Sequence, residues 1–303
     1  MAIVMRTRDR PLLLARAITS VCAQTFRDWR LVVINDGGDA AAVEALLRRQ
    51  AAALAGRASV RHHAEALGME AAHNAGINAT RSEFIAVHDD DDSWHADFLV
   101  KTVAFLDAQS QVPHLAGVAV RIIKISERIS GDRITETGRS WFNLWLSRVT
   151  LFELCGSNPL LPIGLLYRRS VLNRLGLFRC DLKVLCDWEF YLRFLRHFDL
   201  HVLQEGLAYY HVRPESVGAD ANSVLVRDQD LRLHEARLRN QLLREDLDAG
   251  RLGLGVLVNL AVPLQRVVEN TQVPALALDR LLKLPLLRSL AKYLGLVKGV
   301  PLG

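Results

Sequence analysis

The sequence lacks the features that define several protein classes. Its four cysteines are scattered with no Cys-x-x-Cys pair, which argues against a zinc site or a disulfide framework and favours a reducing compartment. No dense run of Lys and Arg is interleaved with aromatic residues, so nothing indicates nucleic-acid binding. No apolar run reaches the roughly 18 residues of a membrane-spanning helix. Met1 leads directly into a strand-like run, so we expect no signal peptide and a cytoplasmic protein, at most peripheral on the inner face of a membrane.

Length and charge set the remaining limits. A chain of 303 residues that is 50% hydrophobic can bury a full core in one large domain or two. The formal net charge of +5 is mildly basic and fits anionic substrates or an anionic membrane surface.

The first half of the chain alternates strands and helices. Apolar runs predict strands over 2–5, 31–34, 59–62 and 83–88, and helical spacing predicts helices over 12–23, 40–55, 69–79 and 95–109. This alternation indicates an α/β fold with a parallel sheet and right-handed crossovers.

The second half is less regular. We expect strands over 115–126, 163–167, 201–203 and 207–212, a hairpin over 128–138, and helices over 169–175 and 187–198. Trp141, Phe142 and Trp145 either belong to the core or line a pocket, and we favour the core for these aromatic residues. From about residue 222 the pattern is helical, with segments over 225–247 and 252–268.

Four adjacent carboxylates, Asp89 to Asp92, follow the apolar strand at 83–88. The four charges repel one another, and a hard divalent cation bound among them would make the arrangement favourable. Ligands of open α/β sheets bind at the carboxyl ends of strands, which is where these residues lie. The alternative is a solvated acidic turn that caps the next helix. The sequence leaves both readings open.

Two further carboxylates stand at element boundaries. Asp36 lies in a glycine-containing turn after the second strand, where it can reach a ligand or simply form the turn. Asp187 opens the helix at 187–198, where it either caps the helix or points into a cleft.

Eight short motifs occur in one order that resembles family 2 glycosyltransferases of the GT-A fold. They cover roughly residues 1–220: Met5-Arg6-Thr7-Arg8-Asp9-Arg10-Pro11, Ser20-Val21-Cys22-Ala23-Gln24-Thr25, Val33-Ile34-Asn35-Asp36-Gly37-Gly38-Asp39, Asn74-Ala75-Gly76, His88-Asp89-Asp90-Asp91-Asp92-Ser93-Trp94, Gly176-Leu177-Phe178 with Cys186-Asp187-Trp188-Glu189, and Tyr209-Tyr210-His211-Val212-Arg213-Pro214-Glu215-Ser216. The resemblance implies a mixed, mainly parallel sheet flanked by helices, with a C-terminal helical extension.

The resemblance also implies a site. The nucleotide of a nucleoside diphosphate sugar would lie against five residues: Thr7, Arg8, Asp36, Asp89 and Asp90. Asp91, with His211 as a further candidate, would hold Mg²⁺ or Mn²⁺ as a Lewis acid at the departing diphosphate. Arg213, Asp92 and Trp188 would belong to the diphosphate and acceptor region.

Asp187 matches the catalytic base of the family. In a one-step inverting displacement it would accept the proton of the attacking hydroxyl, in a reaction that serves cell-surface glycan synthesis. The family often has Glu-Asp where this chain has Cys186-Asp187, which keeps the base and removes an acidic neighbour. The expected partners are a nucleotide-sugar donor and a glycan or lipid-linked acceptor.

The resemblance predicts a glycosyltransferase domain over 1–222, and the helical pattern beyond it predicts an extension over 223–303. Within 271–303 basic residues alternate with leucines, a pattern that fits either an anionic membrane surface or a lid or dimer contact. Two other functions stay open. A nucleotidyltransferase would normally carry a glycine-rich loop, which Thr7 to Pro11 lacks, and a non-catalytic binding module would not need Asp187.

Overall fold

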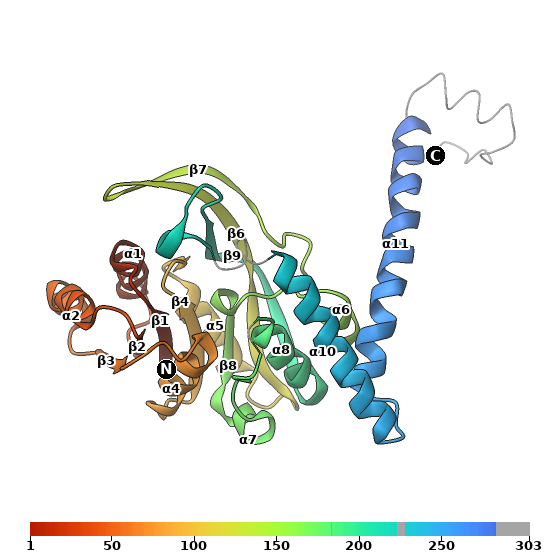
Figure 1. Ribbon diagram of the computed structural model, residues 1–303, viewed down its shortest axis with the longest axis horizontal. Coiled ribbons are helices and arrows are strands. Elements are labelled where there is room, and N and C mark those ends of the chain that lie inside the picture. The colour runs from red at the N-terminus through yellow and green to blue at the C-terminus, as the bar shows by residue number, and fades with distance from the viewer. Residues whose placement is uncertain (183, 223–227, 283–303) are drawn as a thin grey trace, which may run out of the picture.

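The structure, a computed structural model, describes residues 1–182, 184–222 and 228–282 (Figure 1). Within these residues nine strands form one sheet in the order β3-β2-β1-β4-β8-β6-β9-β5, and β7 pairs with β6. The strands are β1 (Ala2–Thr7), β2 (Arg30–Asp36), β3 (Ala58–His63), β4 (Phe84–Asp89), β5 (Ser93–Trp94), β6 (Leu115–Ser130), β7 (Arg133–Trp141), β8 (Leu165–Arg168) and β9 (Asp199–Val212).

Helices cover both faces of this sheet (Figure 1). They are α1 (Pro11–Cys22), α2 (Ala40–Arg49), α3 (Ala51–Leu54), α4 (Met69–Asn78), α5 (Phe98–Ala108), α6 (Leu151–Gly156), α7 (Leu172–Leu175), α8 (Cys186–His197), α10 (Asp228–Asp248) and α11 (Leu254–Leu282). The predicted mixed, mainly parallel α/β fold with C-terminal helices is confirmed.

The parallel half of the sheet fixes where the site lies. β1 pairs in parallel with β2 and β4, and its register sets Arg6 opposite Asp89 and Thr7 opposite Asn35. The carboxyl ends of these three strands therefore meet at one edge. The predicted site residues Thr7, Asp36 and Asp89 share that edge.

Both faces of β1 are buried, which explains its unbroken apolar sequence. Ile3 and Met5 pack with α1 and α2 on one face, and Val4 packs with α4 on the other. A methyl group added at Gly76 would lie 2.3 Å from a Val4 methyl carbon, so a glycine lets α4 approach the sheet.

The C-terminal helices pack beside α6 and α8, and α11 then projects from the body (Figure 1). Arg239 on α10 lies 4.6 Å from the Trp188 ring and donates to the Cys155 carbonyl at 2.9 Å. Leu238 on α10 and Val258 on α11 are buried in the core that contains α8. None of the described helices is both long and apolar enough to cross a bilayer.

Several predicted elements differ in extent. The helix expected over 95–109 begins only at Phe98, because the chain after the aspartates first pairs with β9 as β5. The helix expected over 40–55 is divided into α2 and α3 at Gln50. The strands expected over 201–203 and 207–212 are one strand, β9, whose pairing with β6 shifts register.

The prediction that Trp141 and Trp145 are core residues is wrong. Their exposed fractions are 45% and 69%, because β7 ends at Trp141 and the chain then follows the surface toward α6. Phe142 is partly buried against the core. The sequence analysis did not predict α6, which a capping box of Thr150 and Glu153 starts.

Candidate functional site

The four aspartates lie at the carboxyl end of β4. Burial raises the pKa of Asp89 to about 7, with the charges of Asp91, Asp90 and, more weakly, Asp187 adding to the effect. Burial and the charge of Asp91 likewise raise the pKa of Asp90 to about 6 and that of Asp92 well above its ordinary value. The cluster therefore holds more negative charge than its surroundings stabilise.

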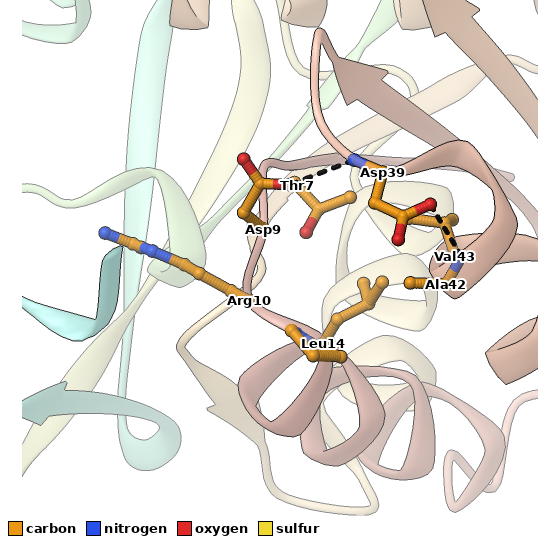
Figure 2. A pocket seen from close by; sticks show the side chains of 8 residues that line it. Thr7, Asp9, Arg10, Leu14, Asp39, Ala42 and Val43 are labelled. Carbon is orange, nitrogen blue, oxygen red and sulfur yellow. Dashed lines mark hydrogen bonds between the residues drawn. The ribbon is translucent and has the colours of Figure 1, made fainter. Parts of the chain in front are cut away.

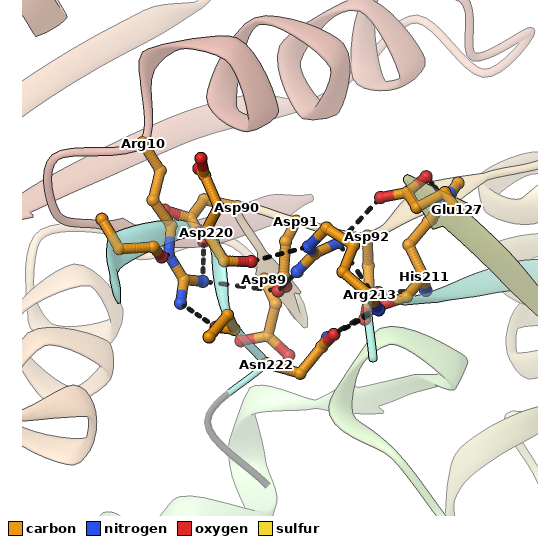
Figure 3. Close-up of polar contacts among 12 residues, drawn as sticks. Arg10, Asp89, Asp90, Asp91, Asp92, Glu127, His211, Arg213, Asp220 and Asn222 are labelled. Atoms are coloured by element: carbon orange, nitrogen blue, oxygen red, sulfur yellow. Dashed lines mark hydrogen bonds and ion pairs between the residues drawn. The ribbon is translucent and has the colours of Figure 1, made fainter. Parts of the chain in front are cut away.

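Two guanidinium groups compensate Asp91 (Figure 3). Arg213, whose side chain is fully buried, pairs with Asp91 Oδ2, and Arg10 Nη1 lies 3.3 Å from the same oxygen and 3.3 Å from Asp90 Oδ1. Both arginines also hold the loop around Gly218–Asp220. Arg213 Nε donates to the Asp220 carbonyl at 2.8 Å, and Arg10 Nη2 donates to the Ala221 carbonyl at 2.8 Å.

Glu127 on β6 lies beside Arg213 and His211 (Figure 3). It contacts Arg213 Nη1 at 2.8 Å, His211 Nδ1 at 2.8 Å and Arg16 Nη1 at 2.6 Å. Burial alone would raise its pKa, but the hydrogen bond with His211 and the charge of Arg16 outweigh burial and lower the pKa to about 2. Glu127 is therefore ionised at neutral pH.

Both ring nitrogens of His211 have partners in this arrangement. Nδ1 faces Glu127, and Nε2 lies 2.8 Å from the hydroxyl of Ser93, just after the aspartates. The His211 backbone N–H donates to Asp92 Oδ1 at 2.9 Å, which fixes the buried Asp92 to β9. Asp92 thus supports the turn from inside.

Asp36 is fully buried and saturated with donors. Its carboxylate accepts from the backbone N–H groups of Leu67 at 2.9 Å and Gly68 at 3.1 Å, and pairs with His63 at 3.0 Å. Burial would raise its pKa, but the His63 and Leu67 hydrogen bonds and the charge of Arg6 lower it. A ligand that reaches this carboxylate must replace one of those partners.

A cavity of about 220 Å³ opens between the starts of α1 and α2 (Figure 2). Its lining includes Thr7, Asp9, Arg10 and Asp39. Of the residues predicted to bind the nucleotide, it contains Thr7; Arg8 is exposed beside it. The aspartate run does not line the cavity, and Arg10 connects the two by reaching from the cavity wall to Asp91.

Asp187 lies in the first turn of α8, after Leu185 in a left-handed conformation (φ 65°). Burial raises the pKa of Asp187 to about 6, against the opposing effect of the backbone N–H of Trp188 and the side chain of Asn158. Asn158 Nδ2 donates to Asp187 Oδ2 at 3.1 Å. A carboxylate with such a pKa is suited to accept a proton near neutrality.

Trp188, assigned to the acceptor region from sequence, lies inside the protein. Its indole N–H donates to the Leu154 carbonyl at 2.7 Å, and Arg239 covers its ring. Its neighbour Asp187 points in another direction, toward Asn158, while Trp188 anchors α8 to α6 and α10. The physical reason is helical geometry, since adjacent residues point about 100° apart.

The donor set suits a divalent cation. Within the described residues no three His, Cys, Asp or Glu side chains converge on one point. Mg²⁺ commonly binds through one or two carboxylates plus substrate phosphates, so Asp91 and Asp89 can be sufficient. The raised pKa of Asp89 indicates anionic charge that a cation would stabilise.

Four polar residues of this region were not identified from sequence as site residues: Arg10, Arg16, Glu127 and Asn158. Arg10 stands within a motif that was recognised, so its position was a usable signal. Glu127 is 84 residues from His211 and 111 from Arg16. Only the folded sheet brings these groups together.

A comparison with family models matches residues 2–176 to "Glycosyl transferase family 2". The "Uncharacterized glycosyltransferase YwdF" of Bacillus subtilis (strain 168) is 25% identical over 193 residues, which cover 63% of this chain and 66% of that protein.

Solved structures share the fold. S. aureus TarS 1-349 in complex with UDP-GlcNAc superposes with a TM-score of 0.60 at 17% identity, over 80% of this chain and 66% of that one. The complex with UDP has a TM-score of 0.55 at 19% identity, over 71% and 61%. Mannosyltransferase PcManGT from Pyrobaculum calidifontis, in complex with GDP-Man and Mn²⁺, has a TM-score of 0.54 at 14% identity, over 96% and 82%. The chain spans less than two thirds of the length of YwdF and of the TarS fragment.

Proposed function

The chain belongs to glycosyl transferase family 2, and from this membership we propose that it transfers a sugar from a nucleoside diphosphate sugar to an acceptor hydroxyl with inversion. One observation carries the proposal. Asp187, beyond the matched residues, is held by Asn158 at the start of α8, and its charge contributes to the raised pKa of Asp89, more weakly than the charges of Asp91 and Asp90 do. A carboxylate that can accept a proton is therefore near an anionic cluster suited to a cation and a diphosphate.

The donor half of the site would be formed by the strand ends. Asp91, with Asp89 and His211, would hold Mg²⁺ or Mn²⁺, which supplies Lewis-acid stabilisation of the departing diphosphate. Arg10 and Arg213 pair with Asp91 in the structure, and both would donate to phosphate oxygens when the diphosphate binds. Thr7, Arg8, Asp36 and Asp90 complete the side of the site proposed for the nucleotide.

The acceptor half would be organised by α8. Asn158 orients the Asp187 carboxylate, whose free lone pairs can accept the proton of the attacking hydroxyl. As the acceptor we propose a cell-surface glycan or its lipid-linked precursor. Support for this class comes from the order of motifs in the sequence.

A nucleotide-sugar panel tests the proposal. Structures similar to this chain bind UDP-GlcNAc and GDP-Man, so UDP-sugars and GDP-sugars are tested first by thermal shift with Mn²⁺. A ligand at 100 times its Kd stabilises the fold by about 2.7 kcal/mol, which raises the melting temperature. We expect one nucleotide sugar to raise the melting temperature selectively. In the Asp91→Ala variant, the part of this increase that requires Mn²⁺ should be lost. No shift with any nucleotide sugar would contradict the proposal.

A further inference from the structure

We infer that Glu127 is a positioning residue of the donor site, which fixes His211 and Arg213 in the orientations that meet the diphosphate and its cation. The inference rests on the proposed function. It concerns a residue outside the eight motifs, between the strand expected over 115–126 and the hairpin expected over 128–138, which the structure places on β6.

The pairing of β6 with β7 is irregular next to Glu127. Ser126 pairs with Gly138 but Glu127 pairs with Glu136, so the one extra residue, Thr137, lies on β7. Glu127 keeps the alternation of β6 and follows the buried Ile125 by two residues, so its side chain is turned into the protein. Glu127 has a side chain only 2% exposed, whereas its neighbour Arg128 is exposed.

The two oxygens of the Glu127 carboxylate contact three basic side chains, of which His211 and Arg213 come from one segment and are labelled with Glu127 in Figure 3. Oε2 accepts from Arg16 Nη1 of α1 at 2.6 Å and lies 2.8 Å from His211 Nδ1 of β9. Oε1 accepts from Arg213 Nη1 at 2.8 Å. The guanidinium group of Arg213 is thereby oriented so that its other terminal nitrogen, Nη2, donates to Asp91. One carboxylate thus sets the direction of both groups.

The contact also determines the tautomer of His211. A carboxylate oxygen can only accept, so Nδ1 must carry the hydrogen. In the neutral ring Nε2 then has the lone pair, and it faces the Ser93 hydroxyl at 2.8 Å, beside the aspartates. Histidines that bind metals are oriented by a carboxylate on the other nitrogen in the same way.

A purely structural ion-pair cluster is the competing explanation. Buried ion pairs often contribute little net stability, so a stability measurement cannot distinguish the two roles. The affinity for a nucleotide with its cation does distinguish them, and the tautomer of His211 tests the contact on which the inference rests.

The first test uses the intact wild-type protein and needs no variant. Nitrogen-15 NMR of the imidazole, assigned with His211→Gln, is expected to show the hydrogen on Nδ1 at neutral pH. A hydrogen on Nε2 would overturn the inference, whatever the nucleotide experiments give.

The second test measures binding of UDP and GDP with and without Mn²⁺ by calorimetry. Glu127→Gln keeps the size but cannot accept from all three partners, and we expect the Mn²⁺-dependent affinity to fall about 10–100-fold. Glu127→Asp, which keeps the charge, should recover part of it, and Glu136→Gln on the exposed side of the same hairpin should bind as the wild type does.

The outcomes separate the two claims. Unchanged Mn²⁺-dependent affinity in Glu127→Gln, when the wild type binds, would overturn the role of Glu127 alone. If the wild type binds neither UDP nor GDP, both the proposed donor site and the inference about Glu127 are contradicted. If Glu127→Gln does not fold, the wild-type tautomer and the Glu127→Asp affinity decide.

Discussion

Four identical side chains in a row acquire different properties from their surroundings. Asp91 has two guanidinium partners, whereas burial raises the pKa of Asp89 to about 7 and that of Asp90 to about 6. Asp92 is tied to the backbone of His211. We propose that Asp91 binds the cation once its two arginines turn to phosphate oxygens, and that Asp92 supports the turn.

Asp91→Ala is expected to abolish transfer, because the departing diphosphate loses the group that holds its counter-ion. Nucleotide binding should stop responding to Mn²⁺, which calorimetry with and without EDTA measures. Asp107→Ala, an exposed change on α5, is the matched control and should behave as the wild type. Full activity of the Asp91 variant, or of the wild type in EDTA, would exclude the assignment.

The raised pKa of Asp187 gives a pH profile. The base acts only when ionised, so the transfer rate at saturating donor should rise about tenfold per pH unit below its pKa of about 6 and level off above it. By linkage the same shift removes stability as pH rises through about 6, because the carboxyl ionises more readily in the unfolded chain. A rate that is flat between pH 5 and 7 would argue against Asp187 as the base.

Local patterns identified those residues that stand at the ends of elements. Asp36, the aspartate run and Asp187 each follow or begin an apolar element, which a sequence reveals directly. Glu127 had no such signal, since its partners are 84 to 111 residues away. Trp141 and Trp145 were misassigned because the side chains at the end of a hairpin have no periodicity that indicates burial.

At the scale of elements, α4 links the sheet to the loop before α8. Asn74 exchanges hydrogen bonds with Phe178, donating to its carbonyl at 2.8 Å and accepting from its N–H at 3.1 Å. Gly76, two residues further along α4, lets the same helix contact β1. The motifs Asn74-Ala75-Gly76 and Gly176-Leu177-Phe178 are thus two sides of one contact.

Gly76→Ala should lower the free energy of unfolding by about 1–3 kcal/mol, because the new methyl group overlaps Val4 in the centre of the sheet. Urea denaturation measures this change. Gly138→Ala is the control, since its methyl group would lie 3.9 Å from the nearest atom, the Ser126 Cβ, and stability should not fall. Equal stability of Gly76→Ala and the wild type would show that the contact is not close-packed.

The extent of elements was less predictable than their order. Helical periodicity extended the helix after the aspartates back to residue 95, but backbone pairing with β9 took Ser93 and Trp94 into the sheet. The same kind of long-range pairing joined two expected strands into β9. Pairing partners that are distant in sequence therefore set the boundaries.

At the scale of the whole molecule, the C-terminal helices are attached to the catalytic region. Arg239 joins α10 to Trp188 on α8 and to carbonyls at the end of α6. We keep the division into a glycosyltransferase domain over 1–222 and a helical extension over 223–303 as a proposal. The docking of α10 implies that the extension stabilises α8 and its Asp187.

The hypothesis that residues 271–303 bind an anionic membrane surface starts from their basic, leucine-rich sequence, and residues 283–303 lie outside the described residues. It predicts that the full chain sediments with anionic vesicles, that truncation after residue 270 abolishes this, and that salt weakens it. Neutral vesicles are the control. Salt-independent binding, or none, would favour the lid or dimer contact.

The measurement that tests the central claim most directly compares transfer and donor binding in Asp187→Asn. Asparagine keeps the size and can still accept from Asn158, but it cannot take a proton at neutral pH. We expect transfer to fall by roughly 10²–10⁴-fold with donor affinity and melting temperature nearly unchanged, while Asp181→Asn, on an exposed pair with Arg179, stays active. An Asp187→Asn enzyme that transfers sugar at the wild-type rate would contradict the account.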